Sequence, residues 1–239
     1  MDYIDLCFAD AAANLACDEA LLNFCESGAA EAVLRTWEPH NYFVVVGYSN
    51  KVDREVNVEQ CRAQGIPILR RFSGGGTVLQ GPGCLNYTLV ILNDLLGASI
   101  DLVSSYRFVL ERHRAMCERL IGRAVEVAGI SDLAIAGKKL SGNAQHRKRR
   151  CTLFHGTFLL NFDLPLITQL LPLPSKQPEY RGGRAHGEFL CNLGISEKAL
   201  RDALQSEWQA QRPLSGLSEN EIVELVSRRY KRDDWNEKF

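Results

Sequence analysis

The middle of the chain is made of short apolar runs that clusters of Gly, Pro and Asn interrupt, and this pattern constrains the fold most. Runs of this length that are rich in β-branched and aromatic residues indicate strands, because such side chains suit a half-buried pleated surface. The predicted strands cover residues 32–37, 42–48, 66–72, 77–80, 85–92, 125–128, 132–136 and 152–162. Hairpins outnumber βαβ units in this arrangement, which predicts an α+β protein with a mixed, largely antiparallel sheet.

Helical periodicity flanks these strands. Apolar spacing predicts helices at residues 11–26, near 57–64, over 102–120 and twice after residue 195. The last of these opens with Ser218 in capping-box spacing. The turn residues Pro39 to Asn41 favour an antiparallel pairing of strand 32–37 with strand 42–48. His113 falls on the apolar stripe of its helix, where we expect a partly buried packing residue.

Composition and charge exclude several classes of protein. The net charge of −1 argues against a general nucleic-acid binder, because neutralising phosphates requires an excess of Lys and Arg. The eight cysteines form no CxxC pair and the five histidines show no metal-ligand spacing, so we expect buried thiols and no structural zinc. The N-terminus lacks a secretory signal, and no apolar run approaches the roughly 18 residues of a membrane span. A cytoplasmic protein without a membrane partner is expected.

The first candidate ligand-binding motif is a glycine-rich loop beside two arginines, Arg70 to Thr77. Three glycines allow backbone N–H groups to approach a ligand, and the guanidinium groups supply fixed positive charge. Such a loop suits a phosphate or a carboxylate. It is not a dinucleotide-binding fingerprint, because Leu79 stands where a third spaced glycine is required. Taken alone, the three glycines are better explained by a mobile turn between strands.

The second motif combines Asp132 with the segment from Gly137 to Ala144. A Walker A loop would require a glycine where Asp132 stands, so that interpretation fails. Lys139 lies between a predicted strand and a turn of small residues, a position that would set its ammonium group against an adenylate phosphate. Without context, a solvated hairpin lysine is the simpler interpretation.

The third motif is the run from Phe154 to Thr157, in which His155 precedes a glycine inside an apolar strand. This histidine either lines a cleft or is a core residue with satisfied hydrogen bonds. Residues 172–188 are polar, rich in Pro and Gly, and long enough to predict a functional loop.

Together the three motifs resemble the lipoate-protein ligase A family, within the superfamily of biotin and lipoate ligases and octanoyltransferases. The matching residues, in the order and spacing of that family, are Arg70 to Gly76, Asp132 and Leu133, Lys139 to Ala144, His155 to Thr157, and Asp163 with Leu164. The resemblance covers roughly residues 1–195 and implies a fold like the catalytic domain of biotin protein ligase. Residues 196–239 would form a small helical C-terminal segment, a reduced accessory region.

The resemblance implies an ATP-dependent reaction. The carboxylate of lipoate would attack the α-phosphate of ATP, with Mg²⁺, and the lysine of an apo lipoyl domain or glycine-cleavage-H-like carrier would then displace AMP. Lys139 would contact the acyl carbonyl and phosphate oxygens as the catalytic residue, and Asp132 would help to bind Mg²⁺. The residues carried over to the substrate and adenylate pocket are Arg71, Ser73, Gly74, Gly75, Gly76, Thr77, Val78, Ser141, Gly142, Ala144, His155 and Thr157.

The chain departs from the ligase pattern at Gln80, where a histidine is common in the family. It also has Ser131 before Asp132, where the family has an asparagine before the aspartate. Most of the family's separate accessory domain is not found in this sequence. A separate accessory subunit is therefore a candidate partner. One rival function is an octanoyltransferase that uses a cysteine thioester and no ATP, for which Cys151 and Cys191 remain candidates. The other is a non-catalytic protein that binds lipoyl carriers, which the joint presence of all three motifs disfavours.

The basic run from His146 to Arg150 joins the Lys139 segment to the His155 strand, so we expect it at a hairpin tip close to the active site. It is either a solvated loop or a surface that steers acidic carrier domains by long-range attraction.

Overall fold

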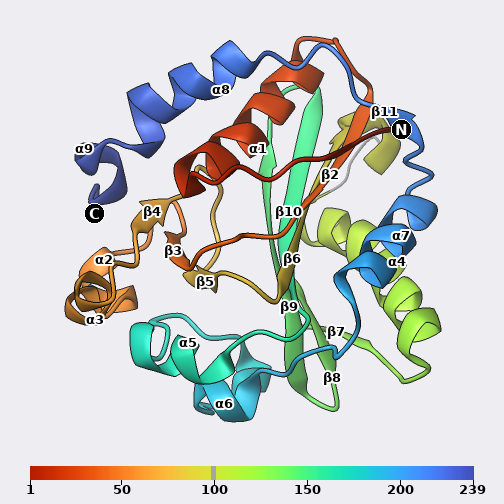
Figure 1. Ribbon diagram of the computed structural model, residues 1–239. Coiled ribbons are helices and arrows are strands. Elements are labelled where there is room, and N and C mark those ends of the chain that lie inside the picture. Colours follow the sequence, from red (N-terminus) through yellow and green to blue (C-terminus); the bar gives the residue numbers. More distant parts are fainter. Residues whose placement is uncertain (98–100) are drawn as a thin grey trace.

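The computed structural model describes residues 1–97 and 101–239, and an eight-stranded sheet runs through its centre (Figure 1). The strands are β1 (Asp2–Asp5), β2 (Ala32–Trp37), β6 (Cys84–Leu92), β7 (Glu126–Ala128), β8 (Asp132–Ile135), β9 (Lys138–Arg147), β10 (Cys151–Leu159) and β11 (Arg212–Pro213). They lie in the order β11-β1-β2-β6-β10-β9-β8-β7. β1 is parallel to both neighbours, and the other pairs are antiparallel. The predicted α+β class with a mixed, largely antiparallel sheet is confirmed.

Helices cover both faces of this sheet. α1 (Ala11–Glu26) contacts β6 and β10 on one face, whereas α4 (Leu102–Ile121) contacts β7 and β8 and packs against α7 (Glu197–Glu207) (Figure 1). Because successive strand residues point to opposite faces, each side of the sheet has its own apolar cluster. The long helices predicted at 11–26 and 102–120 are confirmed to within one residue.

A second, three-stranded sheet lies beside the first and corrects one prediction. Its order is β4-β3-β5, with β4 (Ile68–Arg70), β3 (Phe43–Val46) and β5 (Val78–Gln80). β2 and β3 therefore do not pair with each other, although the sequence predicted that they would. Both strands are fully buried and each pairs with a strand on either side, so tertiary packing decided their partners and the turn residues between them did not. Helices α2 (Val52–Glu55) and α3 (Val58–Ala63) follow β3.

The β9–β10 hairpin corrects two further expectations. The small residues Ser141 to Ala144 lie inside β9, and the turn that precedes this strand is Ala136-Gly137, where both residues have positive φ. The basic run does form the hairpin tip between β9 and β10. However, it lies at the end of β9 opposite Lys139, and Arg147 follows Lys139 by eight positions along the strand, or about 26 Å.

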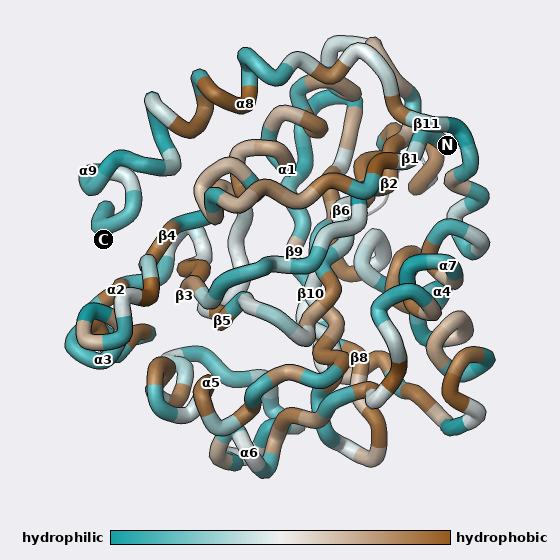
Figure 2. Tube along the Cα trace, in the orientation of Figure 1, coloured by the Kyte–Doolittle hydropathy of each residue, from teal (hydrophilic) through white to brown (hydrophobic). Residues whose placement is uncertain are grey.

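The C-terminal residues pack against the rest of the chain. α8 (Glu219–Leu225) lies on α1 and continues into a π-helical turn, η3 (Val226–Tyr230), and α9 (Asp233–Asn236) contacts β4. Figure 2 shows hydrophilic and hydrophobic residues alternating along α8, as expected for a helix that buries one side. The predicted cap is confirmed, since the Glu221 N–H donates to Ser218 Oγ at 3.3 Å. The division of the chain after residue 195 stays a prediction.

His113 packs more deeply than expected. Its side chain is fully buried against Tyr87 and Trp208, and its Nε2 accepts a hydrogen bond from the Trp208 indole at 2.9 Å. Burial lowers the pKa of His113 to about 3, which suits a neutral packing residue. Among the described helices, none is long and apolar enough to cross a membrane.

Candidate active site

A cavity of about 640 Å³ opens between the two sheets, and the segment that follows α5 (Leu164–Leu170) closes one side of it. Most of the predicted pocket residues meet here, although they come from four strands and the loop between β4 and β5. Those that line the cavity are Arg71, Gly75, Gly76, Thr77, Val78, Asp132, Lys139, Ser141, Gly142, Ala144, His155 and Thr157. Ser73 and Gly74 lie in the same loop but do not line the cavity.

Arg71 shapes the glycine loop from inside. Its guanidinium group donates to the carbonyl oxygens of Gly74 at 2.6 Å and Gly76 at 2.7 Å, and to Ser73 Oγ at 3.1 Å. Because a trans peptide directs its C=O and the next N–H to opposite sides, the N–H groups of Gly75 and Thr77 point away from Arg71. Arg71 has no ion pair among the described residues, and burial lowers its pKa to about 10, so it stays charged at neutral pH. A buried, unpaired cation under outward-facing N–H groups suits an anion.

The strand that enters this loop is held by the C-terminal end of the chain. Arg70 is fully buried and donates to the carbonyl oxygens of Gly47 and Asn50, which belong to the loop after β3. It also donates to the carbonyl oxygens of Trp235 and Asn236, and its own N–H donates to Asn236 Oδ1 at 2.8 Å. The position of the glycine loop therefore depends on residues that lie far away in the sequence.

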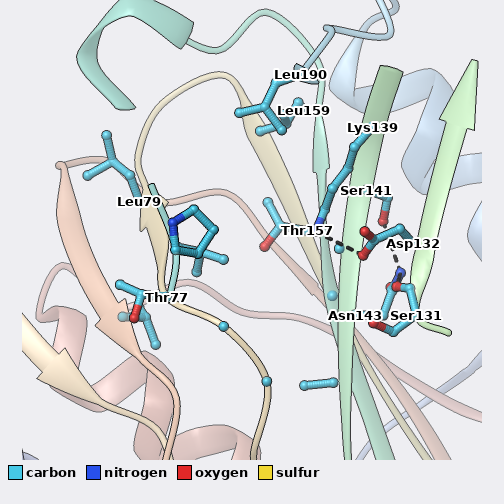
Figure 3. A pocket seen from close by; sticks show the side chains of 18 of the residues that line it. Thr77, Leu79, Ser131, Asp132, Lys139, Ser141, Asn143, Thr157, Leu159 and Leu190 are labelled. Carbon is cyan, nitrogen blue, oxygen red and sulfur yellow. Dashed lines mark hydrogen bonds and ion pairs between the residues drawn. The ribbon is translucent and has the colours of Figure 1, made fainter. Parts of the chain in front are cut away.

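Lys139 and Asp132 form the second charged group of the cavity. Lys139 Nζ lies 2.8 Å from Asp132 Oδ1, and the Tyr180 hydroxyl donates to Asp132 Oδ2 at 2.8 Å. Figure 3 shows Lys139 directed toward Asp132, with Thr77 and Leu79 on the opposite wall. Gly142 makes room for the lysine, because a Cβ there would lie 2.7 Å from Lys139 Nζ. Lys139 is thus placed in the cavity and is not a solvated hairpin residue.

Asn143 fixes the strand that carries Asp132. Its side-chain amide donates to the Ser131 carbonyl at 2.8 Å, and its Oδ1 accepts from the Tyr87 hydroxyl at 2.8 Å. A Cβ at Gly156 would lie 2.0 Å from Asn143 Oδ1, so only glycine fits next to it. Sequence reasoning placed Asn143 inside a motif but did not single it out as a pocket residue.

His155 belongs to a buried polar chain that sequence reasoning missed in part. Its Nε2 lies 2.6 Å from Ser73 Oγ and its Nδ1 lies 2.9 Å from Asp18 Oδ2. Asp18 also pairs with Arg35, which is fully buried, at 2.7 Å. The sequence did carry a signal for Asp18, because it stands three residues after Leu15 and four before Leu22, on the apolar face of α1.

One end of the cavity is apolar. Leu15, Trp37, Val45 and Val78 line it, and Gln80 donates to Thr157 Oγ1 at 2.6 Å at its border. An apolar space next to charged groups suits a ligand with a hydrocarbon chain and an acidic head.

The predicted functional loop forms part of the wall. It contains a short 3₁₀ turn, η2 (Glu179–Arg181), and leads into α6 (His186–Phe189). Pro172, Lys176 and Arg181 from this loop all line the cavity. Its place at the cavity supports the prediction of a functional loop, while its role remains a proposal.

No cysteine is among the described residues that line the cavity. Cys151 is fully buried in β10, and burial raises its pKa. Cys191 is half-buried with its Sγ 3.4 Å from the Lys138 carbonyl, and burial raises its pKa despite the nearby positive charge of Lys138. Neither thiol has the lowered pKa of a cysteine nucleophile.

Residues 10–196 match the sequence profile of the lipoyl protein ligase A/B catalytic domain. The chain belongs to this family. A provisionally named lipoate-protein ligase A of Aeropyrum pernix is 34% identical over 204 residues, which span 84% of this chain and 72% of that protein. The octanoyltransferase LipM of Oceanobacillus iheyensis is 27% identical over 248 residues, which span 96% of this chain and 88% of that protein. The predicted resemblance is confirmed, and the chain is an enzyme of the lipoate ligase and transferase family.

Solved structures share the fold of this family member. A bipartite lipoate protein ligase of Thermoplasma acidophilum, studied with its E2 lipoyl domain, superposes with a TM-score of 0.81 at 23% identity and covers 99% of this chain and 96% of its own. A protein of the same organism with bound lipoic acid has a TM-score of 0.80 at 20% identity, with full coverage of both chains. Lipoate-protein ligase A bound with ATP has a TM-score of 0.77 at 23% identity and 99% coverage of both. At these identities the likeness establishes the fold alone.

Proposed function

We propose that this enzyme is an ATP-dependent lipoate–protein ligase, which converts lipoate to lipoyl-AMP and transfers the lipoyl group to a lysine of a carrier protein. The observation that carries the proposal is the content of the cavity. Arg71, Lys139 and Asp132 line it together with apolar side chains, whereas none of the described lining residues is a cysteine. These are groups that bind and activate an acid through charge, and the nucleophile of a thioester route is missing from the wall.

The first step forms a bond between a carboxylate oxygen of lipoate and the α-phosphorus of ATP and breaks the bond to the β-phosphate, so that pyrophosphate leaves. Negative charge accumulates on the phosphoryl oxygens during this displacement. Lys139 and the outward N–H groups of the loop that Arg71 organises would stabilise that charge, and the apolar space by Trp37 and Val45 would hold the acyl chain. Ser141, Gly142 and Ala144, on the same strand as Lys139, would form the adenylate side of the pocket.

Mg²⁺ fits this site as a companion of the nucleotide. Mg²⁺ usually binds through one or two carboxylates together with phosphate oxygens and water. The described residues contain no cluster of three or more acidic, His or Cys side chains, so a protein cage for the ion is not formed by them. Asp132 offers one carboxylate at the cavity wall, and the ion bound there would offset the charge of the phosphates.

In the second step the amine of the acceptor lysine attacks the acyl carbon, the bond to AMP breaks, and the amine loses a proton. The reacting amine has to enter the cavity from a partner protein, for which a lipoyl domain or a glycine-cleavage-H-like carrier is the proposed substrate. A bipartite ligase studied with an E2 lipoyl domain supports this choice of partner. The same relative supports the proposal that a separate accessory subunit completes the enzyme.

One experiment separates the candidate functions. Purified enzyme is given ATP with lipoate, ATP alone, or an octanoyl thioester of a carrier protein without ATP, and pyrophosphate release and acylation of an apo lipoyl domain are measured. The ligase proposal expects pyrophosphate only when lipoate is present, and no transfer from the thioester. Transfer from the thioester without ATP, together with a trapped acyl-cysteine, would establish the octanoyltransferase that the LipM relatives suggest. Absence of both reactions, even with an accessory subunit, would favour a carrier-binding protein.

A further inference from the structure

A chain of hydrogen bonds runs from the glycine loop through His155 to a buried charge on α1. Arg71 Nε donates to Ser73 Oγ at 3.1 Å, Ser73 Oγ lies 2.6 Å from His155 Nε2, and His155 Nδ1 lies 2.9 Å from Asp18. At the far end, Arg35 and Thr88 donate to the other Asp18 oxygen at 2.7 and 2.6 Å. The loop and α1 are joined by this chain and lie far apart in the sequence.

The hydrogen bond between Asp18 and His155 decides which ring nitrogen of His155 carries a proton. Burial alone would raise the pKa of Asp18, but the hydrogen bond from His155 and the positive charge of Arg35 outweigh burial and hold that pKa below its usual value. An ionised carboxylate only accepts hydrogen bonds, so His155 Nδ1 must be a donor. In the neutral ring, Nε2 is then the acceptor for the Ser73 hydroxyl, and the Ser73 oxygen stays available to Arg71.

A catalytic triad is a natural alternative for a serine, histidine and aspartate in this order. However, the Ser73 side chain is fully buried and does not line the cavity, although His155 and Asp18 do. A serine nucleophile would have to face the substrate. The chain of hydrogen bonds therefore acts on the position of the loop.

We propose that Asp18 is a positioning residue of the acyl-activating site: it fixes the proton of His155 on Nδ1, and through His155 and Ser73 it sets the glycine loop over the substrate. The expected effect on acyl activation rests on the proposed function. The hydrogen-bonded link from Asp18 to the loop is a property of the folded enzyme and holds whatever the reaction is.

The first test needs no substrate. The ¹⁵N signals of His155, assigned by their loss in His155→Gln, report which ring nitrogen carries the proton. Wild-type enzyme and Thr88→Val should both show a proton on Nδ1, whereas Asp18→Asn should lose that preference. Thr88→Val is the matched control, because it removes a hydrogen bond of similar length from the other oxygen of the same carboxylate. A wild-type ring that carries a proton on Nε2 and none on Nδ1 would overturn the proposal.

The second test measures lipoate-dependent pyrophosphate release. Because misplacement of reacting groups by about 1 Å costs up to roughly 10²-fold in rate, Asp18→Asn should lower kcat about 10- to 100-fold with little change in the KM for ATP, and Thr88→Val should not. Equal kcat values for both variants would overturn the proposal. If the wild-type enzyme releases no pyrophosphate, the ligase function fails, and the ¹⁵N experiment still decides the role of Asp18.

Asp18→Asn leaves the buried Arg35 without its counter-charge, which can prevent folding. The double variant Asp18→Asn/Arg35→Gln replaces the ion pair by a neutral pair of similar size. It should fold and show the same altered ring proton and lowered kcat as the single variant. A double variant with wild-type ring protonation and wild-type kcat would refute the link between Asp18 and the loop.

Discussion

The middle glycine of the loop allows the sharpest test of the anion-site geometry. Gly75 has φ +90°, which side-chain-bearing residues rarely adopt, and a Cβ built there would lie 2.8 Å from Arg71 Nη2. Holding an alanine in the left-handed region costs about 1–3 kcal/mol. At 1.4 kcal/mol for each factor of ten, Gly75→Ala should reduce the population of the active loop geometry by roughly 5- to 140-fold. The crowded Arg71 contact adds to this cost.

Gly74→Ala is the matched control, because Gly74 has no positive φ and a Cβ there would meet no atom within 4 Å. We expect lipoate-dependent pyrophosphate release to fall in Gly75→Ala by the factor given above and to stay near the wild-type rate in Gly74→Ala. Thermal unfolding should change little in either variant, since the loop can relax without unfolding the sheets. Equal activity of the two variants would show that Arg71 does not hold the loop in its active shape.

Three further predictions follow from the site and its supports. Lys139→Ala should slow acyl activation by about 10²- to 10³-fold, because it removes a charge that stabilises a developing anion. Replacing the exposed neighbour, in Lys138→Ala, should leave the rate near normal. Normal turnover of Lys139→Ala would exclude the proposed site. Replacement by serine should leave acyl transfer intact at the two candidate thiols, Cys151 and Cys191, and at the buried Cys84. Complete loss of transfer at one of them would instead indicate a thioester route. Asn236→Ala should lower the free energy of unfolding by about 1–3 kcal/mol in a denaturant titration, because it leaves the buried N–H of Arg70 without an acceptor. The control variant Glu237→Ala should not lower it. Equal stability of the two variants would mean that the hydrogen bond from Arg70 to Asn236 does not stabilise the fold.

Much of the candidate site was predictable because its motifs are local. Close approach of backbone and side chains is indicated by the glycines next to Arg71 and by the small residues after Lys139, all within a few positions of each other. Such patterns do not show whether a segment is exposed to solvent or enclosed in a cavity. The same glycines suit a mobile turn, and the same lysine suits a solvated hairpin, until the second sheet and the 172–188 loop enclose them in one cavity.

The sequence alone determined the two long helices and most of the central strands, since apolar periodicity and turn residues act over a few neighbouring positions, but it did not indicate β1, β9 or β11. Tertiary structure alone decided that β2 and β3 belong to different sheets, and that the basic run lies at the far end of β9 from Lys139. It also decided that Asp18 bonds to His155 across 137 residues of chain. Pairing of buried strands and of buried charges depends on which surfaces the whole chain can cover at once, and neighbouring residues carry little information about that choice.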